Sequence, residues 1–267
     1  MPTVQDILDI LQQITPQSLA EDWDNVGLLV GAPHRQAQRV LVALDPTDAL
    51  MDAARAGRFD TIITHHPAIF RPLKSLRTDT PIGGFIARAI REEVGVIACH
   101  TNLDAIPGGV SDVLARALGL DTTRPLVSAG SGCDAACGLG RIGAYPSPLA
   151  PEDFLDRLRR ACAPPWILEA GPRPALIRTA VVCGGSCSDF AETALRFGAD
   201  VFVTAEVKHN VARWAEEAGL WLLDAGHFAT EQPAMTAFGD LLRQRFAALD
   251  WDVTVETALQ HPPLRLA

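Results

Sequence analysis

The sequence has no hydrophobic stretch long enough to cross a membrane. Strongly apolar runs such as 40–44 and 221–223 are far shorter than the roughly 20 residues that a transmembrane helix needs. The N-terminal segment also lacks a basic region followed by a long apolar one, so we expect no export signal. Together these absences predict a cytoplasmic protein that has no membrane partner.

Positive charge is scarce in this chain. Its 23 lysines and arginines are outnumbered by 32 aspartates and glutamates, which gives a formal net charge of −9. A general nucleic-acid-binding protein presents a basic face, so nucleic acid is not an expected partner. The acidic balance suits a protein whose carboxylates meet bound cations.

Cysteine pairs with the C-x-x-C spacing of zinc knuckles and redox motifs are absent. Two pairs instead have three residues between them, Cys133 with Cys137 and Cys183 with Cys187. In a cytoplasmic protein the six cysteines are expected to be reduced thiols with structural roles.

What the chain does contain is an alternation of short apolar segments with helical ones. Short buried strands between helices of 10–15 residues are typical of α/β units with largely parallel pairing. We expect strands at 26–31, 39–45, 60–66, 96–100, 139–145, 175–185 (with its turn), 199–206 and 219–226. We expect helices within 3–16, 47–57, 81–95, 107–120, 151–162, 188–198, 210–219 and 230–246.

This pattern predicts an α/β protein with two similar α/β lobes whose sheets are mostly parallel or mixed. The stretch 121–175 is rich in glycine, proline and alanine and lies between the two halves. We therefore place an approximate boundary near residue 125, which gives an N-terminal α/β lobe at 1–125 and a C-terminal α/β lobe at 126–267.

Residues that can bind metal follow three of the expected strands. The segment TIITHHP ends in His65 and His66, ACHTNLD carries His100 and Asp104, and WLLDAGHFATE carries His227 and Glu231. In open α/β sheets, ligands gather beyond the carboxyl ends of the strands. We therefore expect these imidazoles and carboxylates to come together.

The local spacing agrees with a shared site. Adjacent residues of a strand point to opposite faces, but Pro67 ends the strand, so His65 and His66 can turn toward one side. His227 and Glu231 are four residues apart and share a face if a helix begins by residue 227. Asp104 is expected in a loop.

Each piece also has an explanation without metal. Neighbouring histidines can be satisfied within a loop, Asp104 can tie its own turn, and Glu231 can stabilise a helix N-terminus. Three imidazoles and two carboxylates nevertheless exceed what one structural zinc ion needs, and they suit two metal ions bridged by a carboxylate and a hydroxide. Nitrogen and oxygen ligands accommodate Zn, Fe, Mn, Co or Ni.

Five segments of the chain carry a family resemblance. WDNVGLLVG (23–31), THHP (64–67), CHTNLDA (99–105), TAEVKHN (204–210) and DAGHFATE (224–231) closely resemble the signatures of the Nif-three-like dinuclear-metal-centre family. Its bacterial members are often labelled type-two GTP cyclohydrolase I homologues. The matches follow the expected order over nearly the whole chain.

The resemblance implies a two-lobed α/β subunit with the metal site between the lobes, assembled as a toroidal homohexamer. It also implies two divalent metal ions per subunit. The ligands that it implies are the residues at the three strand ends, His65, His66, Asp104, His227 and Glu231. Residues 121–175 are too few for the extra domain of the long members, so the chain looks like the short form.

Further residues are expected around the metal ions. We expect Glu206 or His209 to handle protons and Lys208 to bind an anionic group; the alternative is a Glu206–Lys208 ion pair with His209 bonded to a metal ligand. His100 is expected to orient Asp104 or a bound water. For the segment 23–25, packing and turn formation are favoured over substrate contact.

The function that these features predict is a metal-dependent hydrolase that acts on a nucleotide or another small anion through a metal-bridging hydroxide. The GTP cyclohydrolase label of the family implies attack on C8 of a purine nucleotide. The alternative is a non-catalytic protein that handles metal ions or forms a ring-shaped scaffold for other proteins.

Overall fold

The chain forms two compact units that do not follow a single cut in the sequence. The computed structural model describes residues 1–120, 122–129 and 135–267. The first unit comprises Met1–Leu103 and Met235–Gln260, and the second comprises Asp104–Ala234 and His261–Ala267. This division differs from the predicted boundary near residue 125, because the C-terminal strand pairs with a strand from the beginning of the chain.

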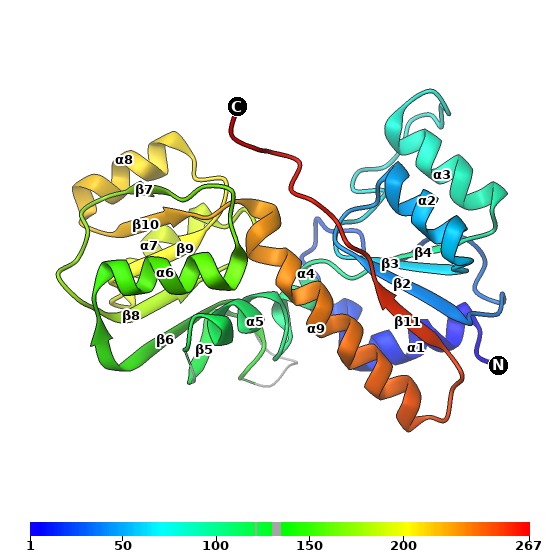
Figure 1. Cartoon of the computed structure of the whole chain (residues 1–267), viewed down its shortest axis with the longest axis horizontal. Coiled ribbons are helices and arrows are strands. Elements are labelled where there is room, and N and C mark those ends of the chain that lie inside the picture. The colour runs from blue at the N-terminus through cyan, green and yellow to red at the C-terminus, as the bar shows by residue number, and fades with distance from the viewer. Residues whose placement is uncertain (121, 130–134) are drawn as a thin grey trace. The chain divides into compact units, whose positions relative to one another are not determined.

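The first unit is built on a mixed sheet in the order β1-β4-β3-β2-β11 (Figure 1). Four neighbouring strands of this sheet run parallel, and β1 at the edge is antiparallel to β4. Its strands are β1 (Gly27–Val30), β2 (Arg39–Ala43), β3 (Thr61–Thr64), β4 (Gly95–Ala98) and β11 (Thr254–Thr257). The carboxyl ends of β2, β3 and β4 therefore meet at one edge of the sheet.

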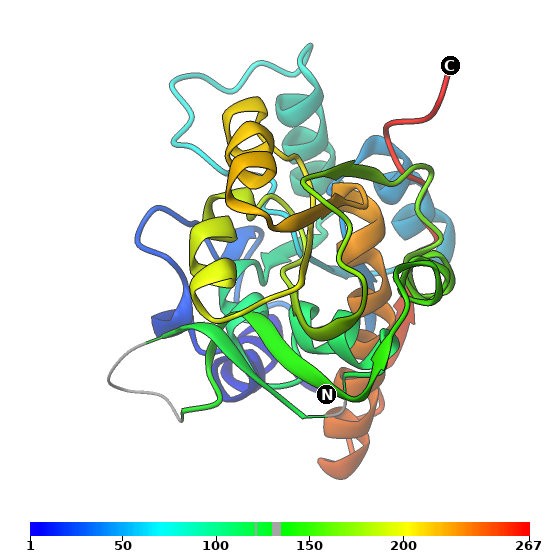
Figure 2. The same ribbon diagram turned by 90° about the vertical axis from the view of Figure 1, so that its left-hand side faces the viewer.

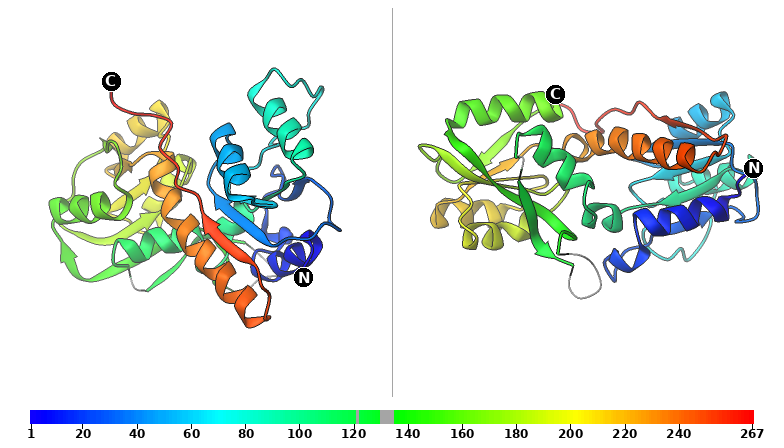
Figure 3. Two further views of the ribbon diagram at one scale, coloured as in Figure 1. Left: turned by 45° about the vertical axis from the view of Figure 1, so that its right-hand side comes forward. Right: turned by 90° about the horizontal axis from the view of Figure 1, so that it is seen from below.

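Helices cover both faces of this sheet. The helices α2 (Asp48–Gly57) and α3 (Pro81–Arg91) share a buried cluster with Leu41 and Ile62 of the strands. The opposite face packs on α1 (Val4–Ile14) and on the later part of α9 (His227–Ala248), as Figures 1 and 3 show. Neighbouring strand residues such as Ile62 and Ile63 point to opposite faces of the sheet and are both buried, as expected for parallel strands covered on both sides.

Side-chain caps explain where the helices of the first unit begin. The Thr3 hydroxyl accepts a hydrogen bond from the Asp6 backbone, and the Asp6 carboxylate accepts one from the Thr3 backbone, which forms a capping box. Thr47 caps α2, and Thr80 caps α3 ahead of Pro81. Each cap satisfies backbone N–H groups that lack a partner in the first turn of a helix.

The second unit contains a six-stranded mixed sheet in the order β5-β6-β8-β9-β10-β7. Its three central strands are parallel, and β5, β6 and β7 are joined by antiparallel pairing. The strands are β5 (Thr123–Ser128), β6 (Gly138–Leu149), β7 (Leu168–Ala170), β8 (Ile177–Val182), β9 (Val201–Thr204) and β10 (Trp221–Asp224). The carboxyl ends of β8, β9 and β10 thus lie together.

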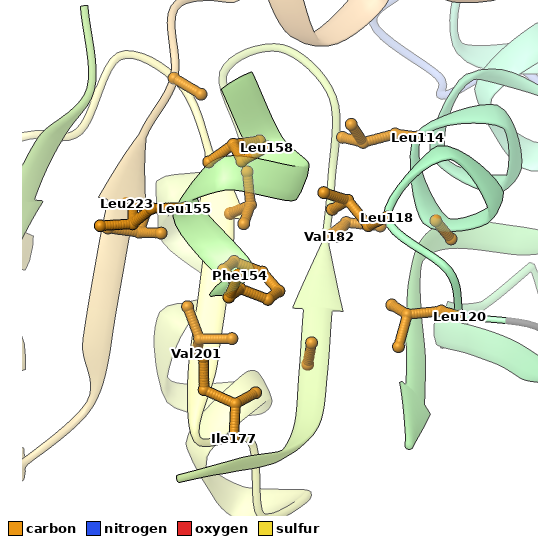
Figure 4. Packing of buried hydrophobic residues seen from close by; sticks show 14 of the residues in the cluster. Leu114, Leu118, Leu120, Phe154, Leu155, Leu158, Ile177, Val182, Val201 and Leu223 are labelled. Carbon is orange, nitrogen blue, oxygen red and sulfur yellow. The ribbon is translucent and has the colours of Figure 1, made fainter. Parts of the chain in front are cut away.

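This second sheet is also covered on both faces (Figure 2). On one face α5 (Val110–Ala117) and α6 (Pro151–Cys162) share a core with β8, β9 and β10, in which Phe154 packs among the strand side chains (Figure 4). On the other face α7 (Ala191–Arg196) and α8 (His209–Ala218) close a second cluster around Phe202. Both units are mixed α/β layers, which confirms the predicted fold class.

The structure adds elements that the sequence pattern does not predict. Strands β5, β7 and β11 are missing from the prediction, as are the 3₁₀ helices η1 (Gln17–Leu19) and η2 (Ser188–Phe190). The expected loop around Asp104 is wrong, because this residue lies in the short helix α4 (Thr101–Ala105). Within the described part of the chain, the helices are too short or too polar to span a bilayer.

The cysteines are not all reduced. Cys99, Cys162, Cys183 and Cys187 carry free thiols. Cys137 is disulfide-bonded, so the expectation of reduced thiols is wrong at this position. Cys133 lies outside the described residues. Burial raises the pKa of both Cys99 and Cys162 to about 12, which makes these two thiols poor nucleophiles and agrees with structural roles.

Candidate metal centre

Three histidines of the first unit gather at the carboxyl ends of β3 and β4. His65 and His66 follow β3, and His100 follows β4. The ring centroids of His65 lie 5.1 Å from those of both His66 and His100, and His66 and His100 are 5.6 Å apart. One nitrogen from each ring lies within 4.8 Å of the others, so this histidine cluster can hold a metal ion.

The end of β3 explains why two adjacent imidazoles turn to the same side. The backbone N–H groups of His65 and His66 donate to the carbonyls of Ala43 and Leu44, so pairing with the chain of β2 continues past the strand. The Thr64 hydroxyl then donates to the His66 carbonyl at 2.7 Å, which bends the chain. The expectation that these two rings meet is confirmed.

Each ring of the histidine cluster is held through its Nδ1 atom by a group that only accepts hydrogen bonds. His65 Nδ1 lies 3.0 Å from the Cys99 carbonyl, His66 Nδ1 lies 2.7 Å from an Asp45 carboxylate oxygen, and His100 Nδ1 lies 2.8 Å from Asp24. The proton of each neutral ring therefore sits on Nδ1, and the lone pair is on Nε2. Histidines that bind metal ions are commonly oriented in this way.

Asp45 is itself fixed by the C-terminal segment of the first unit. The Gln260 side chain accepts from the backbone N–H groups of Leu44 and Asp45 at 2.8 and 3.0 Å and donates to the Asp45 carbonyl at 2.8 Å. The sequence pattern did not single out Asp45, although the predicted strand 39–45 ends at it. Its position after a parallel strand was the available signal.

Asp24 carries the most strongly perturbed carboxylate of this cluster. Its buried side chain accepts from His100 Nδ1 and from the Thr101 backbone and hydroxyl, the last two at 3.0 and 2.5 Å. Burial opposes ionisation, but the hydrogen bonds from His100 and Thr101 outweigh it and hold the pKa of Asp24 well below its usual range. Asp24 therefore holds the His100 imidazole in place, a role in addition to the turn formation that was predicted for it.

Replacing Asp24 with asparagine should lower the free energy of unfolding by roughly 2 kcal/mol near neutral pH, because four hydrogen bonds lose the charged acceptor. These are the three from His100 and Thr101 and a fourth from the Asn25 backbone N–H. The folded pKa lies below the unfolded one, so this stabilisation is present above the unfolded pKa of about 4 and is lost as the pH falls toward the folded pKa. Urea denaturation of both proteins between about pH 3 and pH 7 measures the difference.

The exposed neighbour Asp22 supplies the control for this experiment. An Asp22→Asn variant should match the wild-type protein at every pH, because an exposed carboxylate contributes little. An Asp24→Asn effect that does not change with pH would contradict the hydrogen-bonded carboxylate as its cause.

The second unit presents its own set of metal-capable residues. Helix α9 begins at His227, and His227 Nε2 lies 3.1 Å from a carboxylate oxygen of Glu231 one turn later. His227 Nδ1 lies 3.1 Å from Glu206, which follows β9. Glu231 is buried, and burying a carboxylate is costly unless cations or hydrogen-bond donors compensate it. The predicted sharing of one helix face by His227 and Glu231 is confirmed.

The turn after β8 lies against these residues. A Cβ atom on Gly185 would be 2.2 Å from Glu231 Oε1 and 3.3 Å from His227 Nε2. A hydrogen bond with Cys183, burial, and the nearby carboxylates of Asp104 and Glu231 all raise the pKa of the Cys187 thiol. The carboxylates of Asp104 and Glu231 are therefore both close enough to this turn of the second unit to influence the Cys187 thiol.

The three predicted catalytic residues have different surroundings. Glu206 contacts His227 and so holds an expected ligand through Nδ1. Lys208 pairs with Asp189 at 2.6 Å, not with Glu206 as the alternative proposed. His209 is the exposed first residue of α8. Catalytic roles for Glu206, Lys208 and His209 stay predictions.

The comparison with known proteins decides the family. The family model for Duf34/NIF3 (NGG1p interacting factor 3) matches residues 2–263. The chain belongs to the Duf34/NIF3 family. The resemblance that the sequence motifs indicated is thereby confirmed.

Relatives in the Duf34/NIF3 family match over almost their full length. A Clostridium perfringens protein named GTP cyclohydrolase 1 type 2 homolog is 30% identical over 250 residues, which covers 94% of each chain. A Streptomyces coelicolor protein of the same name is 33% identical over 261 residues, 97% of this chain and 92% of the relative. The crystal structure of a Staphylococcus aureus hypothetical protein has a TM-score of 0.92 at 28% identity and covers 100% of both chains.

The chemistry of both residue sets fits divalent metal ions. Imidazole nitrogens and carboxylate oxygens are common ligands of zinc, iron, manganese, cobalt and nickel. His65, His66 and His100 come together in the first unit, and His227 with Glu231 in the second. His100 was predicted only to orient Asp104 or a bound water, but it follows β4 in the same way that His65 follows β3 and lies in the same cluster.

Proposed function

We propose that this chain binds two divalent metal ions through His65, His66, Asp104, His227 and Glu231, and that it hydrolyses a nucleotide or another small anion. The observation that carries the proposal is the shared orientation of the histidines. His66 and His227 are each held through Nδ1 by a carboxylate, and His65 by a backbone carbonyl. A ring held in this way directs Nε2 at a metal ion.

The five proposed ligands offer three imidazoles and two carboxylates, which suits a dinuclear centre. Two divalent cations would supply hydroxide near neutral pH and polarise the bond that is broken. The residues of the chain would orient and fix the participants. His100, held by Asp24, presents Nε2 for a hydrogen bond to the substrate, while Asp45 and Glu206 keep the rings of His66 and His227 in position.

The names of the relatives support a nucleotide as the substrate. Both the Clostridium perfringens and the Streptomyces coelicolor proteins are called GTP cyclohydrolase 1 type 2 homolog. GTP carries a purine ring and a polyanionic tail, and the predicted reaction attacks C8 of that ring.

Metal analysis tests the first part of the proposal. Protein purified without chelator, and protein stripped with chelator and reloaded with zinc or manganese, should carry close to two ions per chain by plasma mass spectrometry. A content of at most one ion per chain after reloading, with the protein folded by circular dichroism, would overturn the dinuclear centre.

Turnover tests the second part. Metal-loaded protein is incubated with a panel of nucleotides, amides and phosphoesters, and products are separated by chromatography. Hydrolysis that disappears when the metal is stripped supports the hydrolase. Full metal occupancy without turnover, together with specific metal transfer to another protein, would favour the metal-handling alternative.

Two further expectations stay predictions. Assembly as a toroidal homohexamer follows from the family resemblance, and a cytoplasmic location follows from the sequence. Light scattering measures the first of these directly.

A further inference from the structure

Two aromatic side chains lie at the surface beside the histidine cluster. Trp23 is 48% exposed and Phe70 is 39% exposed. Their ring centroids are 5.8 Å apart, and each ring lies close to His100, Trp23 at 6.1 Å and Phe70 at 6.2 Å. The planes of each pair of rings cross at 71° to 80°, so the three rings are roughly perpendicular to one another.

Polar side chains hold these rings in place. Trp23 precedes Asp24, whose carboxylate accepts from His100 and from the backbone of Thr101. Asn25 donates from Nδ2 to the carbonyl of Ile69 at 2.5 Å, which ties the loop of Trp23 to the loop of Phe70. The two aromatic rings are therefore fixed relative to His100 by hydrogen bonds on either side of them.

This construction does not serve core packing. Large aromatic side chains normally stabilise a fold by being buried, whereas Trp23 and Phe70 leave much of their surface exposed to water. Binding sites for small molecules, in contrast, combine aromatic walls with a few fixed polar groups. The rings form such walls directly beside residues proposed to bind metal.

A positively charged side chain lies next to these aromatic rings. The Arg71 guanidinium lies 4.9 Å from the centroid of the Phe70 ring and is exposed. A guanidinium stacked on an aromatic ring still presents its N–H groups at its edge, and these bind phosphate well. The site thus offers two surfaces for a flat ring and a cation for an anionic tail.

We propose that Trp23 and Phe70 receive the flat heteroaromatic ring of a purine nucleotide beside His100, with Arg71 binding its phosphates. The inference rests on the proposed function, whose substrate class it deepens. Bases stack on aromatic side chains through their π-faces, and this contact is strong enough to position the ring that reacts.

Binding to metal-stripped, full-length protein tests the inference without turnover. The probes are guanosine, which has the ring alone, GTP, and inorganic triphosphate, which has the anionic tail alone. Guanosine and GTP should bind by calorimetry and change the tryptophan fluorescence. Trp23→Leu and Phe70→Leu should each weaken guanosine binding by on the order of 5- to 100-fold, the range for loss of one stacking contact.

Further variants separate the ring from the tail. Arg71→Gln should weaken GTP binding and leave guanosine binding unchanged. Phe197→Leu in the second unit is the matched control, because Phe197 is 42% exposed and carries the Arg124 guanidinium 4.7 Å from its ring centroid. This control should bind guanosine like the wild-type protein.

The outcomes distinguish this inference from the proposed function. Wild-type protein that binds triphosphate but no guanosine, or Trp23→Leu and Phe70→Leu variants that bind guanosine normally, would overturn the aromatic site. Loss of self-association in these two variants, without any guanosine binding, would overturn it too and assign the rings to contact with a second copy of the chain. In each case two metal ions per chain and hydrolysis of another substrate would leave the proposed function standing.

Discussion

Replacing His66 with alanine is expected to remove metal binding at the proposed centre and to leave the fold intact. The substitution deletes a ring whose Nδ1 lies 2.7 Å from an Asp45 carboxylate oxygen, and with it one of the proposed metal ligands. We expect metal affinity to fall by more than the roughly 10- to 100-fold that follows loss of an orienting partner. Competition with a chromophoric chelator measures the affinity.

The stability of this variant should change little. His66 and Asp45 are both partly exposed, so water can solvate the carboxylate that the ring leaves behind. The thermal midpoint of the metal-free variant should therefore lie close to that of metal-free wild type. Metal added to the wild type should raise its thermal midpoint, because an ion that binds only the folded protein shifts the folding equilibrium toward the folded state. Metal added to the variant should not raise the midpoint, because the binding site is lost.

Two other variants bracket this result. His34→Ala removes an exposed histidine and should keep two metal ions at wild-type affinity. Asp45→Asn keeps the size of the orienting residue but not its charge. Its loss of metal affinity should therefore lie between those of His34→Ala and His66→Ala. A His66→Ala protein that retains both metal ions at wild-type affinity would exclude the proposed ligand set.

Gly185→Ala should be among the most destabilising single substitutions in the second unit. Gly185 has a φ of +71°, a conformation that costs an L-residue about 1 to 2 kcal/mol. The added Cβ would also lie 2.2 Å from the buried carboxylate of Glu231. Forcing atoms into such a site typically costs a further 1–3 kcal/mol, so we expect a total loss of roughly 2–5 kcal/mol in urea denaturation.

The turn cannot easily move away from this clash. The Gly185 N–H donates to the Thr230 hydroxyl at 3.0 Å, and its carbonyl accepts from the Ala205 backbone and the Thr204 hydroxyl at 2.9 and 3.0 Å. Glu231 must therefore shift, and metal affinity should fall together with stability.

Gly198→Ala separates the two causes. Gly198 has a similar φ of +80°, but no described atom lies within 4 Å of its Cβ position. This variant should lose only the backbone term of about 1 to 2 kcal/mol and should keep its metal affinity. Equal effects at Gly185 and Gly198 would show that contact with Glu231 is unimportant.

Much of the site was visible in local patterns of the chain. His65 and His66 stand where a run of β-branched residues ends before Pro67, and the spacing of His227 and Glu231 is that of one helical turn. Such features depend on strand and helix periodicity, which neighbouring residues establish. The edge of a parallel sheet then predicts that separate strand ends meet.

The partners of those residues were not visible in this way. Asp24 meets His100 across 76 positions, Asp45 meets His66 across 21, and Gln260 reaches Asp45 across 215. The boundary of the first unit depends likewise on β11, which pairs with β2 near the other end of the chain. Periodicity tells which face of an element is buried, but which distant side chain lies opposite depends on how the elements pack. For that reason the amino-acid order specified the candidate metal ligands, whereas the packed fold determined which carboxylates orient them and which aromatic rings lie beside them.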